Sequence, residues 1–198
     1  MGLFDGLFGG KKQKAKTSKS QYLPDVKEPD EISFAKNFTE KGGRFIFCES
    51  LDEAQQNFNA ILKEHQWTSN EVVCIQKELG EHFNLNVSPK GGKKILKNAP
   101  VLFLTCEYLI ANTGGIMICS SQVHKIALPE LPEQLIIFAS TSQISSDVSE
   151  GMSSLKSKYF EDLPTNITTL NPKHPDRETD FLSYGNNSKN IYLLLVEA

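Results

Sequence analysis

Residues 106–123, CEYLIANTGGIMICSSQV, place a polar tetrad between two apolar segments. Gly114 and Gly115 permit positive φ and close backbone approach, so their amides could point at an anion. Asn112 and Thr113 would add hydrogen-bonding side chains beside them. The alternative is a plain turn, because Asn-Thr-Gly-Gly is good turn chemistry between two strands. Spacing alone favours the turn slightly over the binding site.

Further polar residues lie at the two ends of this stretch. Ser120, Ser121 and Gln122 follow the second apolar segment and could orient polar groups of a ligand. Glu107 directly follows the apolar run 101–106, and functional groups of parallel sheets gather at the carboxyl ends of strands. Glu107 is therefore a candidate base or nucleophilic carboxylate.

Two polar loops carry charges that suit an anionic ligand. Lys90 and Lys93 lie in SPKGGKKILKN, at an expected loop-to-helix boundary, without the spacing of a phosphate-binding P-loop. A solvated lysine-rich turn is the alternative there. Arg177 and Asp180 lie three residues apart in the last long loop, where they could form an ion pair or grip a ligand.

Composition excludes several classes of function. Four cysteines and four histidines show no C-x-x-C, H-x-H or H-E-x-x-H spacing, so no metal site is expected. The net charge of −3 gives no basic field for nucleic acid. No apolar run reaches the ~20 residues of a membrane span. Single cysteines in apolar runs are typical of buried thiols in a reducing compartment, so a cytoplasmic protein is expected.

The amino-terminal segment, residues 1–30, is expected to be a tail and linker ahead of one domain, residues 31–198. It begins with an apolar patch and continues with lysines, which is the reverse of a signal peptide. Gly6 stands where a myristoylation motif requires Ser or Thr. Two interpretations stay open: a disordered tail, or a peptide of residues 1–20 that docks a membrane surface or a partner.

The rest of the chain alternates short apolar strands with amphipathic helices. This alternation predicts an α/β fold whose mostly parallel sheet is covered by helices on both faces. A hairpin or half-turn is expected between the third and fourth strands, where the connection is too short for a helical crossover. Strands are expected at 44–50, 71–76, 101–106, 115–120, 134–140, 166–170 and 190–197. Helices are expected at 51–65 and 145–160, with a short helix through Leu79 and Phe83 between them.

The segment YLIANTGGIMICSSQVHKIALPELPEQLIIFA resembles the LUD-domain family, which includes lactate-utilisation protein C. Ile110, Ala111, Thr113 and Gly114 match the family's I-A-[ED]-T-G segment, and Leu128-Pro129 follows in order. The resemblance covers roughly residues 35–197. It implies the fold shared by sugar-phosphate isomerases, CoA-transferases and formyltetrahydrofolate cyclo-ligases, with a ligand site at the carboxyl ends of the strands.

The resemblance also implies a role in the oxidation of lactate to pyruvate, with the redox centres in iron-sulfur partner proteins and no cofactor in this chain. Asn112 replaces the family's acidic residue, and a second signature survives only as Arg177, Asp180 and Gly185. These departures favour an accessory, non-redox protein that binds a small anionic metabolite or a partner. The alternatives are a transferase or ligase that uses Glu107, and a scaffold docked through its amino-terminal tail.

Overall fold

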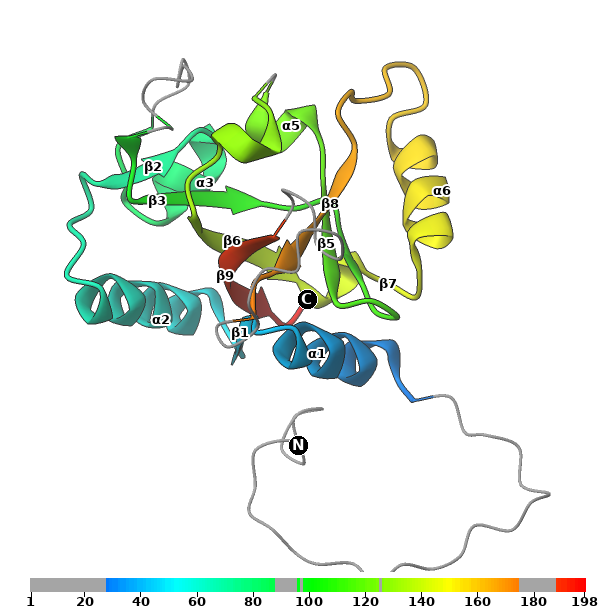
Figure 1. Cartoon of the computed structure of the whole chain (residues 1–198), viewed down its shortest axis with the longest axis horizontal. Coiled ribbons are helices and arrows are strands. Elements are labelled where there is room, and N and C mark those ends of the chain that lie inside the picture. The colour runs from blue at the N-terminus through cyan, green and yellow to red at the C-terminus, as the bar shows by residue number, and fades with distance from the viewer. Residues whose placement is uncertain (1–27, 88–95, 97, 125, 175–187) are drawn as a thin grey trace, which may run out of the picture.

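A computed structural model describes residues 28–87, 96, 98–124, 126–174 and 188–198 as an open α/β sheet flanked by helices (Figure 1). The strands are β1 (Arg44–Cys48), β2 (Val72–Cys74), β3 (Val101–Thr105), β4 (Tyr108–Ile110), β5 (Gly115–Ile118), β6 (Gln134–Ser140), β7 (Ile144–Ser145), β8 (Thr168–Pro172) and β9 (Ser188–Val196). The helices are α1 (Asp30–Glu40), α2 (Leu51–Glu64), α3 (Lys77–His82), α5 (Ser120–Val123) and α6 (Val148–Lys158), with short 3-10 turns at Leu128–Glu130 and Thr141–Gln143.

The sheet is mostly parallel, as the apolar strand runs predict. Its order is β2-β3-β6-β9-β8-β5-β4-β7, and β1 also pairs with β9. Parallel ladders join β2 to β3, β3 to β6, and β6 to β9, and β9 pairs in parallel with both β1 and β8. The antiparallel pairs are β4 with β5 and β5 with β8. The expected α/β fold class is therefore confirmed.

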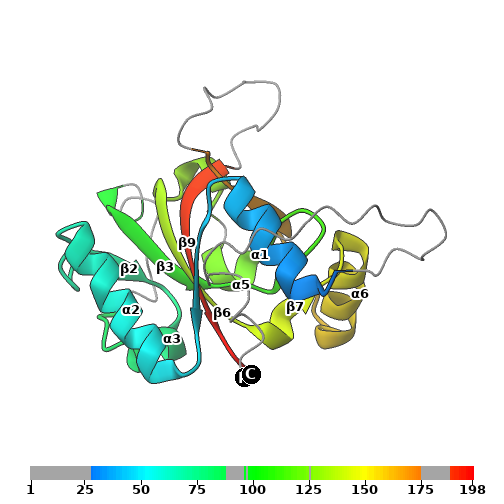
Figure 2. The ribbon, with the colours of Figure 1, turned by 90° about the horizontal axis from the view of Figure 1, so that it is seen from below.

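Two hydrophobic cores lie on the two faces of the sheet because side chains alternate along each strand. In β6, Leu135 and Ile137 belong to one core, while Ile136 belongs to the other. Helix α1 covers the first core with Phe34, and α2 covers the second with Phe58. Figure 2 shows α1 and α2 on opposite sides of the central strands.

The expected hairpin lies between the third and fourth expected strands, but it includes an additional short strand that the sequence does not predict. β3 ends at Thr105, and a separate short strand, β4, then pairs with β5 across the turn. A second difference is α1. The sequence does not predict this helix, because an acidic stretch with two prolines precedes it. Helix α1 is nevertheless fixed by tertiary packing, because it buries Phe34 and Phe38 completely.

Candidate functional site

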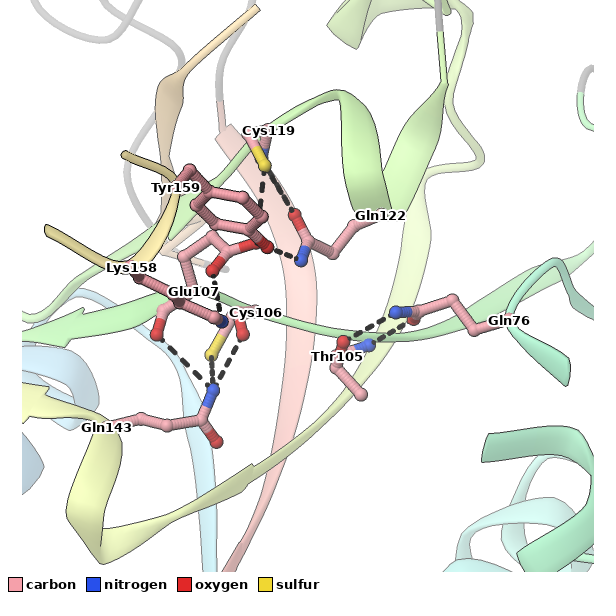
Figure 3. A network of polar contacts seen from close by, with 9 residues as sticks. All are labelled: Gln76, Thr105, Cys106, Glu107, Cys119, Gln122, Gln143, Lys158 and Tyr159. Carbon is pink, nitrogen blue, oxygen red and sulfur yellow. Dashed lines mark hydrogen bonds and ion pairs between the residues drawn. The ribbon is translucent and has the colours of Figure 1, made fainter. Parts of the chain in front are cut away.

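The carboxyl ends of β2, β3 and β6 lie at one edge of the sheet, where ligands bind in open α/β folds. Gln76, Thr105 and Gln143 lie at these three strand ends, and Glu107 follows two residues after β3 (Figure 3). The Gln76 side chain accepts a hydrogen bond from Thr105 N at 2.8 Å and donates one to Thr105 Oγ1 at 2.7 Å. This pair ties the start of α3 to the end of β3.

The backbone around Glu107 is fixed from two sides. Glu107 N donates to Met117 O at 2.8 Å, which extends the hairpin ladder to the residue before β4. Gln143 Nε2 donates to Cys106 O at 2.6 Å and lies 3.3 Å from Glu107 O. Gln143 also accepts a hydrogen bond from Ser140 N, so the turn after β6 is joined to the end of β3. The site is therefore built on rigid elements rather than on a free loop.

The Glu107 carboxylate is buried and accepts hydrogen bonds from four side chains. Its side chain is only 1% exposed. Oε1 accepts from Gln122 Nε2 at 2.8 Å, Tyr159 Oη at 2.9 Å and Cys119 Sγ at 3.3 Å. Oε2 forms an ion pair with Lys158 Nζ at 2.8 Å. Figure 3 shows these side chains converging on the carboxylate from separate segments of the chain.

Burial opposes ionisation of Glu107, but the donors outweigh it. Gln122, Lys158, Cys119 and Tyr159 together hold the pKa of the Glu107 carboxyl below its ordinary value. Burial would lower the pKa of Lys158, and Glu107 more than offsets this, so the pKa of Lys158 is raised. The pair is therefore a carboxylate and an ammonium at neutral pH. Such a carboxylate is a weak base, because its charge is already stabilised where it lies.

Helix α6 brings Lys158 and Tyr159 to the site. Asp147 caps its first turn by accepting a hydrogen bond from Glu150 N at 2.9 Å. Gly151 lies inside this helix and lets it approach β4 closely, because a Cβ there would lie 3.2 Å from Ile110 Cδ1. Lys158 ends the helix with a side chain that is 53% exposed, so its ammonium bridges the buried carboxylate and the solvent.

Helix α5 supplies the other two donors directly after β5. Gln122 accepts a hydrogen bond from Cys119 N at 2.9 Å through Oε1, while its Nε2 donates to Glu107. The sequence singled out Gln122 as a ligand-orienting residue, and in the structure its amide contacts Glu107. Burial raises the pKa of the Cys119 thiol, which therefore stays protonated and donates. Cys119 was expected to be a core thiol, and no sequence signal marked its contact with Glu107.

The Asn-Thr-Gly-Gly tetrad lies at the other end of the hairpin from Glu107. The three residues of β4 lie between them and alone span about 10 Å, at roughly 3.3 Å per residue. The tetrad amides are donated within the protein: Asn112 N to Ser146 O, Thr113 N and Gly114 N to Ile110 O, and Gly115 N to Thr113 Oγ1.

Gly114 has a clear packing role in the tetrad. Its φ is +64°, and a Cβ at this position would lie 2.3 Å from Phe38 N of α1. Asn37 of α1 donates to Ala111 O at 2.8 Å beside it. This geometry accounts for the glycine as a turn that packs on α1. Ligand binding by Asn112, Thr113, Gly114 and Gly115 stays a prediction.

The remaining candidates divide between surface and undescribed segments. Ser120 Oγ accepts a hydrogen bond from Thr165 N at 3.0 Å, and Ser121 is exposed. Lys90, Lys93, Arg177 and Asp180 lie outside the described residues. No sequence signal marks Lys158 or Tyr159, because nothing local identifies the end of a surface helix as the partner of a distant carboxylate.

In the part of the chain that the structure describes, no group of three or more His, Cys, Asp or Glu residues is arranged to hold a metal ion. Within the same residues, no helix combines the length and apolarity that a membrane crossing requires.

Comparison with known proteins supports the resemblance noted in the sequence. The model of the LUD domain matches residues 33–196. The fold is also similar to the crystal structure of a DUF162-family protein from Deinococcus radiodurans, with a TM-score of 0.60 and 14% identity over 84% of this chain and 96% of that one. A search of curated proteins gave no match. Since the family model spans most of the sequence, this chain belongs to the LUD-domain family.

Proposed function

We propose that this chain is an accessory, non-redox protein of organic-acid utilisation that binds a small carboxylate at the Lys158–Glu107 pair. Membership of the LUD-domain family implies a function of the lactate-utilisation type. The observation that carries the finer proposal is a half-exposed ammonium held beside a buried carboxylate, at the sheet edge where α/β folds bind ligands. Lactate and pyruvate are the small carboxylates that the family role suggests, and the cytoplasm is the proposed compartment.

Lys158 supports this proposal through its free donor capacity. An ammonium has three donors, and Glu107 takes one at 2.8 Å. Glu107 raises the pKa of Lys158 and so keeps it charged. A ligand carboxylate would bind the same ammonium as Glu107 without displacing Glu107. The Glu107 carboxylate stays in place because Gln122, Tyr159 and Cys119 also donate to it.

The second candidate function is a transferase or ligase that uses Glu107 as a nucleophile. An ionised carboxylate at a strand end favours it, since only the ionised form attacks. Burial and four donors weigh against it, because both oxygens are occupied and the side chain is 1% exposed. Mass spectrometry after incubation with acyl-CoA donors and hydroxylamine would separate the two: an adduct or hydroxamate at Glu107 supports the enzyme, and an unmodified Glu107 supports binding alone.

A thermal-shift screen of lactate, pyruvate, CoA, nucleotides and folates tests the binding proposal. A ligand at 100 times its Kd stabilises the folded state by about 2.7 kcal/mol. For a chain of this size that corresponds to a rise in Tm of about 5–10 °C. Lactate or pyruvate should give this rise at saturation. If none of the five classes stabilises the protein, the proposal is wrong.

Matched variants locate the site. Lys158→Met should abolish the ligand-dependent shift, whereas Lys156→Met, an exposed lysine of the same helix, should retain it. Thr113→Val should also retain it, because Thr113 lies at the far end of the hairpin. Loss of the shift in Thr113→Val together with its retention in Lys158→Met would move the ligand to the tetrad and refute the Lys158 site.

A further inference from the structure

The segment that follows α6 exposes apolar and acidic side chains together. Phe160 is 88% exposed and Leu163 is 45% exposed, which makes them two of the four large apolar side chains described as exposed. Glu161 and Asp162 lie between them and are also exposed. An aromatic ring that is almost wholly in water, flanked by two acids, is suited to a partner that is apolar and basic. We name residues 160–163 the FEDL surface.

One segment of this chain has the complementary composition. Residues 1–20 join an apolar patch to a lysine cluster and contain a single acid, Asp5. The apolar residues are Leu3, Phe4, Leu7 and Phe8, and the lysines are Lys11, Lys12, Lys14, Lys16 and Lys19. We propose that this amino-terminal segment docks on the FEDL surface of its own chain, with its apolar patch against Phe160 and Leu163 and its lysines beside Glu161 and Asp162.

The fold places the origin of the segment within reach of this surface. The first turns of α1 contact Ala111 through Ser33 and Asn37, and the adjacent Asn112 donates to Ser146, two residues before α6. Helices α1 and α6 therefore begin close together, as Figures 1 and 2 both show. The FEDL surface lies at the other end of α6, about 16 Å away for 11 residues at 1.5 Å each.

The length of the segment covers this span. A stretch of 20 residues reaches at most about 66–72 Å when fully extended, which is well beyond the length of α6. Tethering also gives an effective concentration in the millimolar range, which favours a contact within one chain over the same contact between copies. An anionic membrane is the less suitable occupant, because Glu161 and Asp162 would be repelled by its surface charge. This docking does not depend on the proposed carboxylate site.

Paramagnetic labelling of the full chain tests the docking. The four native cysteines are at most 3% exposed, so a nitroxide added to Gly10→Cys labels only the introduced thiol. NMR should then show attenuated amide signals at residues 159–163 and unchanged signals around Leu51. Leu163→Ser should restore the attenuated signals, whereas Leu51→Ser should not, since Leu51 has a similar exposure of 49% at the start of α2.

Three outcomes would overturn the proposal. The first is the absence of attenuation at residues 159–163 in the labelled chain. The second is equal attenuation in the wild-type background and in Leu163→Ser. The third is attenuation of isotope-labelled, nitroxide-free protein mixed with nitroxide-labelled protein, which would show docking on a second copy. Loss of the attenuation in 1 M salt, where the screening length is about 3 Å, would support the contribution of the lysines.

Discussion

Glu107→Gln removes one charge from the buried cluster and keeps the side-chain shape, so it measures what the carboxylate contributes to stability. Gln122 and Tyr159 each donate to Oε1 within 3.0 Å, and a bond to a neutral acceptor is weaker by about 1 kcal/mol than one to a charged acceptor. The new amide nitrogen would replace Oε2 and face Lys158, which leaves a buried donor without an acceptor at about 1 kcal/mol. Lys158 itself turns into solvent at little cost because its side chain is half exposed.

The expected loss is therefore about 3 kcal/mol of unfolding free energy at pH 7, which is roughly 6–12 °C in Tm. Urea unfolding followed by circular dichroism measures it. Glu81→Gln is the matched control, because Glu81 is 62% exposed and lies 3.7 Å from Lys77. A surface pair of this kind contributes about 0.5 kcal/mol or less.

The pH dependence of this difference provides a second measurement. The pKa of Glu107 is lowered in the folded state, so its contribution is present above the unfolded pKa and is lost as pH falls through the folded pKa. The pKa of Lys158 is raised, so its contribution is present below its unfolded pKa and is lost only at alkaline pH. The unfolding free energies of the wild type and Glu107→Gln should differ most between about pH 5 and pH 10 and converge in acid. A loss no larger than that of Glu81→Gln, or a difference that grows in acid, would refute the reasoning.

Two further predictions concern the hairpin turn and the thiols. Gly114→Ala should destabilise the protein by about 2 kcal/mol or more in urea unfolding, because it combines a φ of +64° with a Cβ placed 2.3 Å from Phe38 N. A loss of less than about 0.5 kcal/mol would contradict that packing. The native thiols should react with a disulfide reagent at pH 8 only when the protein unfolds. All four are buried, and burial raises their pKa values, that of Cys74 to about 11. Rapid labelling of any thiol in the folded protein would contradict this prediction.

Local sequence pattern predicts much of the fold. The strand β6 follows from a continuous apolar run, and α2 follows from its amphipathic spacing and from Ser50, whose hydroxyl accepts a hydrogen bond from Glu53 N at 3.2 Å. Helix α1 could not be predicted in this way, because its two phenylalanines are buried only by the sheet on which the helix packs. The short strands β4 and β7 are likewise defined by pairing rather than by pattern.

The candidate site shows the same division. The rule that functional groups gather at the carboxyl ends of parallel strands was sufficient to single out Glu107 from the sequence. The rule cannot name partners that lie 51 and 52 residues further along the chain, as Lys158 and Tyr159 do. The sequence of the polar tetrad is ambiguous, because glycine and amide residues suit both turns and anion sites. Only the hydrogen bonds of the folded hairpin reveal where its amides are donated.

The sequence by itself therefore determined the α/β class, the family and the strand end that carries a carboxylate, because hydrophobic periodicity and short motifs are local properties of the chain. Tertiary structure alone decided the state of that carboxylate. Helices α5 and α6 bring four donors to Glu107 from segments remote in sequence, and their combined effect exceeds the cost of burial. Charge in a protein interior depends on which groups meet in space, and that is a property of the fold.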